Sequence, residues 1–148
     1  MEFKSKKVIA KNRKAKFDYH ILDTYEAGIV LKGSEVKSIR QGKVSLSDAF
    51  AQVVGREILL FNMHISPYDK AQDALDSKRE RKLLLKKSEI RKIDGKLKNK
   101  GLTLIPLEVY IKKNLVKISL AVVKGKKEFE KRGKIIEKEQ RREMKKYI

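Results

Sequence analysis

The apolar residues of this chain occur only in short runs of four or five, such as residues 58–61 and 120–123. A helix that crosses a membrane needs about 20 apolar residues in a row, so the sequence predicts no membrane span. Short runs that are separated by glycine, asparagine and charged residues are typical of β-strands. The pattern therefore predicts a protein that is built mainly from strands.

The clearest predicted hairpin pairs residues 46–54 with residues 57–65. Its loop is Gly55-Arg56, and two-residue loops of this kind favour a type II′ turn. Apolar side chains occupy both alternating sets of the second strand, so we expect that strand to be central, with its Asn62 end near a rim.

Further strands are expected on either side of this hairpin. Residues 17–32 are interpreted as two strands that bend at residues 26–28, and residues 81–85 as one short strand. Residues 102–111 and 115–123 are expected to pair through a turn at residues 112–114. Pro106 suits an edge or bulge position in the first of these two strands.

Two short helices complete the prediction. The first lies within residues 33–43, with Ser34 as its expected N-cap and Gly42 as its stop. The second begins at Ser88 and ends at Gly101. Six or seven short strands and two helices in about 110 residues close most economically as a small antiparallel barrel, of which the OB-fold is the commonest nucleic-acid-binding form.

Charge divides the chain more sharply than hydropathy does. The 38 Lys and Arg residues exceed the 19 Asp and Glu residues and give a net charge of +19. Residues 1–16, 76–100 and 124–148 carry +6, +7 and +6, so the remainder is neutral. Charge that only serves solubility would be spread evenly; this partition indicates a folded body that presents basic segments to an acidic partner.

Three regions are therefore expected: a basic N-terminal arm at residues 1–16, a barrel body at residues 17–123 and a basic tail at residues 124–148. The tail has too few apolar residues to order its backbone, so we expect it to be disordered when free. A supporting surface would allow a helix from Ile135 to Tyr147.

Features that the sequence lacks indicate the cellular compartment and exclude several kinds of site. The N-terminus has no apolar stretch of the kind found in secretory signals, and the chain has no cysteine, which excludes disulfides, thiolate zinc sites and a cysteine nucleophile. We expect a cytoplasmic protein.

Catalysis is not expected either. The two histidines, His20 and His64, have no metal-ligand spacing, and Asp18, Asp23 and Glu26 do not converge on them. The sequence also has no phosphate-binding loop and no nucleophile motif, so no cofactor or metal is predicted.

Binding residues are easier to propose. Asn12 lies between Lys11 and Arg13, where its amide could contact a base edge, and the Glu26 carboxylate could accept from base amino groups. The alternatives are that Asn12 caps a turn and that Glu26 pairs with a lysine. Three tyrosines could stack on bases or could instead pack in the core: Tyr19, Tyr25 and Tyr68.

Six blocks carry a more specific pattern, in order: NRKAKFDY at 12–19, EAGIVLKGSEVKSIRQGK at 26–43, MHISPY at 63–68, RKLLL at 81–85, KGLTLIPL at 100–107 and GKK at 125–127. With these blocks the chain resembles the SsrA-binding proteins (small protein B), the bacterial partners of transfer-messenger RNA. The match runs from about residue 8 to residue 132.

The resemblance implies an OB-like barrel with flanking helices and no catalytic activity. It implies binding to the tRNA-like end of transfer-messenger RNA, one monomer per RNA, and entry into ribosomes stalled on messages without a stop codon. The barrel would stand where an anticodon arm would be. The tail would order against small-subunit ribosomal RNA in the decoding site and the empty message channel.

Residue by residue, the resemblance places Asn12, Glu26 and Leu84 at the transfer-messenger RNA face, with Leu84 as an apolar contact. The basic residues expected beside them are Arg13, Lys14, Lys37, Arg81 and Lys82. The residues expected to meet ribosomal RNA are Lys126, Lys127, Phe129, Glu130, Lys131 and Arg132.

The chain departs from the family pattern in two places. Glu130 replaces an aspartate, and Phe129 stands where a histidine is common; a phenylalanine can stack on a base but cannot donate a hydrogen bond. The loop before residue 81 reads ALDSKRE, without the usual Asp-Pro and additional arginine.

Three other functions would account for part of the sequence. A nucleoid-type DNA-binding protein would carry similar charge, although a carboxylate and a leucine at the interface favour folded RNA. An RNA-processing enzyme would depend on His20 or His64. A binder of anionic membranes would need an amphipathic helix with a bulky apolar face, which the sequence lacks.

Overall fold

Strands dominate the computed structural model, which describes residues 6–68, 76–99 and 101–126. The described strands are β1 (Lys7–Lys11), β2 (Tyr19–Ile29), β3 (Val44–Ser45), β4 (Phe50–Val54), β5 (Glu57–Phe61), β6 (His64–Ile65), β7 (Arg81–Leu84), β8 (Leu102–Lys112) and β9 (Leu115–Gly125). The described helices are α1 (Ala15–Asp18), α2 (Gly33–Arg40) and α3 (Lys87–Leu97). The prediction of a mainly β protein with flanking helices is confirmed.

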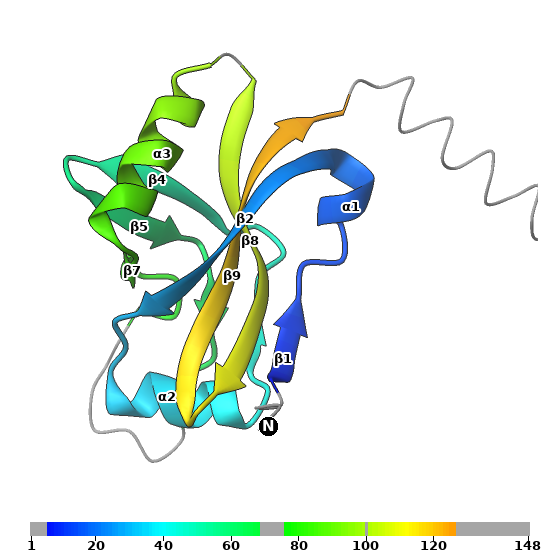
Figure 1. The fold of residues 1–148 in the computed structure, drawn as a ribbon. Helices are drawn as coiled ribbons and strands as arrows, with labels where there is room; N and C mark the ends of the chain where they lie inside the picture. The colour runs from blue at the N-terminus through cyan, green and yellow to red at the C-terminus, as the bar shows by residue number, and fades with distance from the viewer. Residues whose placement is uncertain (1–5, 69–75, 100, 127–148) are drawn as a thin grey trace, which may run out of the picture.

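Six strands pair in a ring. The large sheet has the order β1-β8-β4-β5-β7-β2-β9, and β9 pairs back with β8. Every pairing in this sheet is antiparallel, and β1 pairs with residues 108–111 of β8, beyond the residue of β8 that pairs with β4. Strands β3 and β6 form a separate pair. Figure 1 shows β2, β8 and β9 crossing the centre of the molecule, with α2 and α3 at opposite ends.

The strands β2, β8 and β9 are longer than predicted, at 11 residues each. The prediction of two strands within residues 17–32 is wrong, because residues 19–29 form one strand after the short helix α1. The irregular register lies between Ile21 and Asp23 rather than at residues 26–28. At Gly28 the strand instead gains a second partner, since Gly28 pairs with both Leu84 and Lys117.

Both predicted hairpins are confirmed, although the first strand of the first hairpin begins at Phe50 rather than at residue 46. Gly55 has a φ of 65° in the β4–β5 turn, a conformation that glycine adopts without steric cost. The β8–β9 turn needs only Lys113 and Asn114, which have φ values of 54° and 63°, as a type I′ turn requires. The register of β8 also shifts between Pro106 and Glu108, which confirms the predicted bulge.

The second hairpin strand is central, as predicted, because β5 lies between β4 and β7. It ends at Phe61, however, and residues 64–65 form the separate strand β6. Asn62, with a φ of 61°, separates the two. The buried positions change from residues 58 and 60 before it to residues 63 and 65 after it, which explains the apolar side chains in both alternating sets.

The helices begin before the predicted caps. Lys32 and Lys86 are the N-cap residues, and their backbone N–H groups donate to Glu35 Oε1 at 2.9 Å and Glu89 Oε1 at 3.0 Å. A glutamate at the third helical position satisfies a donor at the helix start in this way, so Ser34 and Ser88 are not needed as caps. Helix α3 ends at residue 97 rather than at Gly101.

The main core fills the ring. It joins fully buried side chains from the strands with Ile39 of α2 and Ile93 of α3. A second cluster lies where α1 packs on β8 and β9, and it contains Ala15, Ile105 and Ala121. Residues 15 and 16 of the predicted N-terminal arm thus belong to an element that packs on the sheet. Within the described ranges, no helix is both long and apolar enough to span a membrane.

Candidate nucleic-acid interface

Strand register brings three of the predicted RNA-binding residues to one surface. Leu83 and Ala27 are buried in the core. Because successive strand residues point to opposite faces, Lys82 and Leu84 of β7 and Glu26 of β2 point outward. We call this surface the β2–β7 face; it comprises Glu26, Gly28, Val30, Lys82, Leu84 and the cross-strand neighbour Lys117.

At the centre of the β2–β7 face, Leu84 lies over the backbone of Gly28. The Leu84 residue is 50% exposed although it is apolar, and a Cβ at position 28 would lie 3.3 Å from the Leu84 Cβ. The absent side chain therefore leaves room for Leu84 to lie flat. Sequence reasoning missed the contact between Gly28 and Leu84; the available signal was a glycine inside an apolar strand, which can mark close approach of another group.

Glu26 is held as a carboxylate at the edge of this face. Its Oε2 accepts hydrogen bonds from Tyr110 Oη at 2.5 Å and Lys112 Nζ at 3.3 Å. The Tyr110 hydrogen bond lowers the pKa of Glu26; burial opposes this, and Lys112 and Lys117 lower the pKa further. The side chain is still 42% exposed. The alternative that Glu26 pairs with a lysine is therefore correct, because Glu26 pairs with Lys112. The paired Glu26 carboxylate is still accessible to solvent and can accept further hydrogen bonds.

Tyr110 is the buried member of the same cluster. Burial, followed by the hydrogen bond to Glu26, raises the pKa of its hydroxyl, so Tyr110 remains a donor at neutral pH. Lys6 Nζ lies 4.4 Å from the centre of the Tyr110 ring, within the range of a cation–π contact. The basic side chains around Glu26 thus give this carboxylate a positively charged rim.

Asn12 follows Lys11, which lies three strand spacings from Glu26 along one row of the sheet. The pairings Lys11–Glu108, Glu108–Ser119 and Ser119–Glu26 define that row, which spans roughly 14 Å at the usual strand spacing. Asn12 Nδ2 donates to the carbonyl of residue 106 at 3.2 Å. This contact supports the structural alternative for Asn12 at the turn into α1, where Arg13 and Lys14 are exposed.

Arg81 requires a correction. Its residue is 1% exposed, and its guanidinium donates to Glu35 Oε2 at 2.7 Å, to the carbonyl of Met63 at 2.7 Å and to the carbonyl of Ser77 at 3.2 Å. Because these groups enclose it, the Arg81 side chain is a structural residue and cannot contact RNA in this structure. Its neighbour Lys82 is exposed and pairs with Glu57 at 3.0 Å.

The other predicted residues are dispersed. Lys37 lies on α2, with its Nζ 5.4 Å from the centre of the Tyr68 ring. Tyr25 packs against the core, and its hydroxyl accepts from Lys96 Nζ, which also pairs with Asp23. Tyr19 packs against the second cluster. The described residues contain no group of three His, Asp or Glu that could hold a metal ion.

Only the start of the predicted tail is described. Residues 124 and 125 continue β9, and Lys126 donates through its backbone N–H to the Asp18 carbonyl at 2.9 Å and through Nζ to the Lys16 carbonyl at 2.8 Å. The predicted tail residues outside the described part are Lys127, Phe129, Glu130, Lys131 and Arg132, together with the expected helix at 135–147.

Comparisons with known proteins agree on one family. The family model described as "SmpB protein" matches residues 9–148. The SsrA-binding protein of Caldanaerobacter subterraneus subsp. tengcongensis is 56% identical over 141 residues, which cover 95% of this chain and 89% of that protein. The SsrA-binding protein of Halothermothrix orenii is 53% identical, covering 93% of this chain and 90% of the relative.

A solved structure has the same fold. A chain of the structure described as "tmRNA-SmpB: a journey to the center of the bacterial ribosome" superposes with a TM-score of 0.68 at 49% identity, covering 80% of this chain and 85% of that chain. Sequence, family model and fold therefore agree over most of the length. The chain belongs to the SmpB family.

Proposed function

We propose that this protein binds the tRNA-like domain of transfer-messenger RNA and delivers it to stalled ribosomes for trans-translation. Membership of the SmpB family supports this function, as do relatives named SsrA-binding proteins and a structural neighbour described with transfer-messenger RNA and the ribosome. The protein acts in the cytoplasm as a monomeric adaptor, one per RNA, and catalyses no reaction itself.

The observation that carries the proposal is the chemistry of the β2–β7 face. An exposed leucine over a bare glycine backbone offers an apolar surface to an unstacked base or a ribose. The ionised Glu26 can accept hydrogen bonds from base amino groups, which a surface that binds only phosphate does not need. Lys82, Lys112 and Lys117 surround these groups with positive charge for the RNA backbone.

The proposal extends to the fold and the tail. The ring of six strands acts as a small OB-like barrel that completes the shape of a tRNA. Residues 124–148 act in the decoding site and message channel, where Lys126, Lys127, Lys131 and Arg132 contact ribosomal RNA. Phe129 stacks on a base there, and Glu130 takes the place of the family's aspartate.

The substitution Glu26→Gln tests the binding face. It keeps the shape of the side chain but removes its charge, so affinity for transfer-messenger RNA should fall more than affinity for bulk tRNA. The matched control is Glu80→Gln, because Glu80 is also an exposed glutamate but lies outside the β2–β7 face. Equal losses on the two RNAs, or equal effects of the two variants, would make Glu26 a structural residue only.

Delivery is tested by tagging in a reconstituted translation system. Ribosomes stalled on a message without a stop codon should add the tag peptide when transfer-messenger RNA and this protein are both present. Omission of the protein should abolish tagging. Tagging at the same rate without the protein would contradict the adaptor function.

A further inference from the structure

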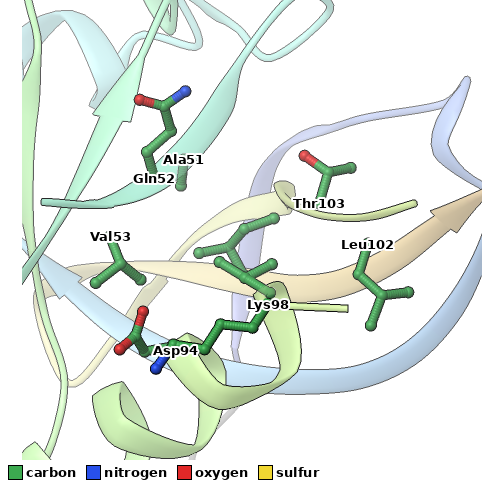
Figure 2. A pocket seen from close by; sticks show the side chains of 9 residues that line it. Ala51, Gln52, Val53, Asp94, Lys98, Leu102 and Thr103 are labelled. Carbon is green, nitrogen blue, oxygen red and sulfur yellow. The ribbon is translucent and has the colours of Figure 1, made fainter. Parts of the chain in front are cut away.

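Two adjoining hollows lie between α3 and the β4–β5 hairpin. One, of about 340 Å³, is lined by β4, the end of α3 and the start of β8; the other, of about 510 Å³, is lined by the hairpin turn and the start of α3. Both include Val53 and Asp94 in their walls. Figure 2 shows Asp94 and the extended Lys98 side chain of α3 facing Val53 across the first hollow.

The groove exists because two strands diverge. Strand β4 pairs with β8 only at Ala51 and Leu104, and next to that pair the end of α3 lines the first hollow together with both strands. Ile93 is buried beneath the helix, whereas Ile90 and Leu97 are only partly buried and form part of the groove wall. None of the residues of the β2–β7 face lines either hollow, so the groove is a separate surface.

The rim of the groove is strongly basic. Arg56, Lys87, Arg91 and Lys98 lie along it, and none of them forms an ion pair with an acidic residue in the described part of the chain. Asp94 is the one acidic residue in the lining of the two hollows. The groove thus combines a partly apolar wall, a central carboxylate and a surplus of cations.

We propose that this groove binds an unpaired nucleotide of RNA, as a second contact separate from the β2–β7 face. The base packs against the side chains of Val53, Ile90 and Leu97. The Asp94 carboxylate accepts from an exocyclic amino group, as carboxylates do from cytosine N4. Arg91, Lys87 and Lys98 contact the phosphates on either side. The hollows have the volume of ordinary small-ligand sites.

The same observations disfavour an acidic peptide as the occupant. A peptide carboxylate would meet the Asp94 carboxylate at the centre of the groove, and like charges at close range repel. A nucleotide avoids this conflict, because its negative charge is on the phosphates and its base edge can donate hydrogen bonds. The inference rests on the proposed RNA-binding function but concerns another surface.

The test is an NMR titration of the full chain with cytidine and uridine oligonucleotides of about ten residues, within the usual site size for one OB-fold. Cytidine should shift the amide signals of residues 53, 56, 91, 94 and 98 and should bind about tenfold more tightly than uridine, since uracil has no amino group. Asp94→Ala should remove this preference while leaving uridine binding at least as tight.

Arg91→Ala and Lys92→Ala form the matched pair, because both residues are exposed on α3 but only Arg91 lines the groove. Arg91→Ala should lower the slope of log affinity against log salt by about 0.7, the value for one phosphate contact of a single strand. Lys92→Ala should leave the slope unchanged. Equal effects of the two variants would overturn the proposal.

Three further outcomes would also overturn it: no shifts in the groove with either oligonucleotide, no preference for cytidine, or tighter binding of poly-glutamate than of RNA. Failure of the proposed function would differ from these. In that case the groove would still respond to cytidine, but the protein would not prefer transfer-messenger RNA to bulk tRNA.

Discussion

Glu35 and Arg81 form an ion pair inside the protein, with Arg81 Nη2 2.7 Å from Glu35 Oε2 and side-chain exposures of 5% and 0%. Arg79 contributes a second guanidinium, whose Nη2 lies 2.5 Å from Glu35 Oε1. Because Arg81 also donates to the carbonyls of Met63 and Ser77, the pair joins β7, α2 and the residues after β5. Its first role is to hold these segments together.

We expect Arg81→Ala to destabilise the protein by about 3–5 kcal/mol, because it removes the fully buried member of the ion pair and takes a hydrogen-bond donor from Glu35 and from the buried carbonyls of Met63 and Ser77. Lys82→Ala is the matched control on the next residue. It removes only an exposed pair with Glu57 and should cost about 1 kcal/mol or less. Urea denaturation of the two variants measures both values; equal losses would contradict the structural role of Arg81.

The ion pair should also make stability depend on pH. Burial raises the pKa of Glu35, but hydrogen bonds from Arg79, the Lys32 backbone and Arg81 outweigh it, and the pKa is lowered overall. A carboxyl with a lowered folded pKa stabilises the protein above its unfolded pKa, and this contribution disappears as pH falls through the folded value. The difference in unfolding free energy between wild type and Glu35→Gln should therefore be largest at about pH 7 and should shrink below about pH 4.5. A difference that stayed constant to about pH 3 would contradict this.

Leu84→Ala should weaken transfer-messenger RNA binding without unfolding the protein. The leucine is 50% exposed, so stability should change by about 1 kcal/mol or less. Covering the exposed half of a leucine side chain is worth about 1 kcal/mol, which predicts a complex that is weaker by roughly fivefold. Leu115→Ala is the control, because Leu115 is similarly exposed, at 58%, in the β8–β9 turn region. If both variants bound RNA equally well, Leu84 would have no direct contact.

Much of this arrangement could be predicted from local sequence. The turns at Gly55-Arg56 and Lys113-Asn114 stand out because glycine and asparagine tolerate positive φ, and strand alternation correctly places Leu84 outside. Helix starts were less predictable. Glu35 and Glu89 satisfy the helix N-termini from the third position, so the serines that resemble caps are not used.

Long-range relationships could not be predicted from the sequence. Arg81 lies in a basic motif, so the sequence alone suggests that it is exposed. In the structure Arg81 points into the protein, as Leu83 does, whereas Lys82 between them points outward. Its partner Glu35 is 46 residues away in the chain. The second pairing of Gly28 and the groove under α3 likewise depend on where strands diverge in space, which no local pattern records.

The structure indicates the residue after which the tail should be truncated. Truncation after Lys126 keeps all of β9 and the contacts of Lys126 with Lys16 and Asp18, so transfer-messenger RNA affinity should remain while tagging is lost. Truncation after Val123 also removes the pairs of residues 124 and 125 with β2, and it should lower the unfolding temperature as well. A large loss of RNA affinity in the longer variant would contradict the division between barrel and tail.

The most direct test of the account is a binding titration of the full chain against transfer-messenger RNA at fixed salt. Bulk tRNA and duplex DNA are added in excess as separate competitors, because charge alone would bind all three. If the β2–β7 face recognises transfer-messenger RNA, binding is tight and survives both competitors. Loss of the complex to either competitor would mean that the net charge of +19, rather than the β2–β7 face, governs what this protein binds.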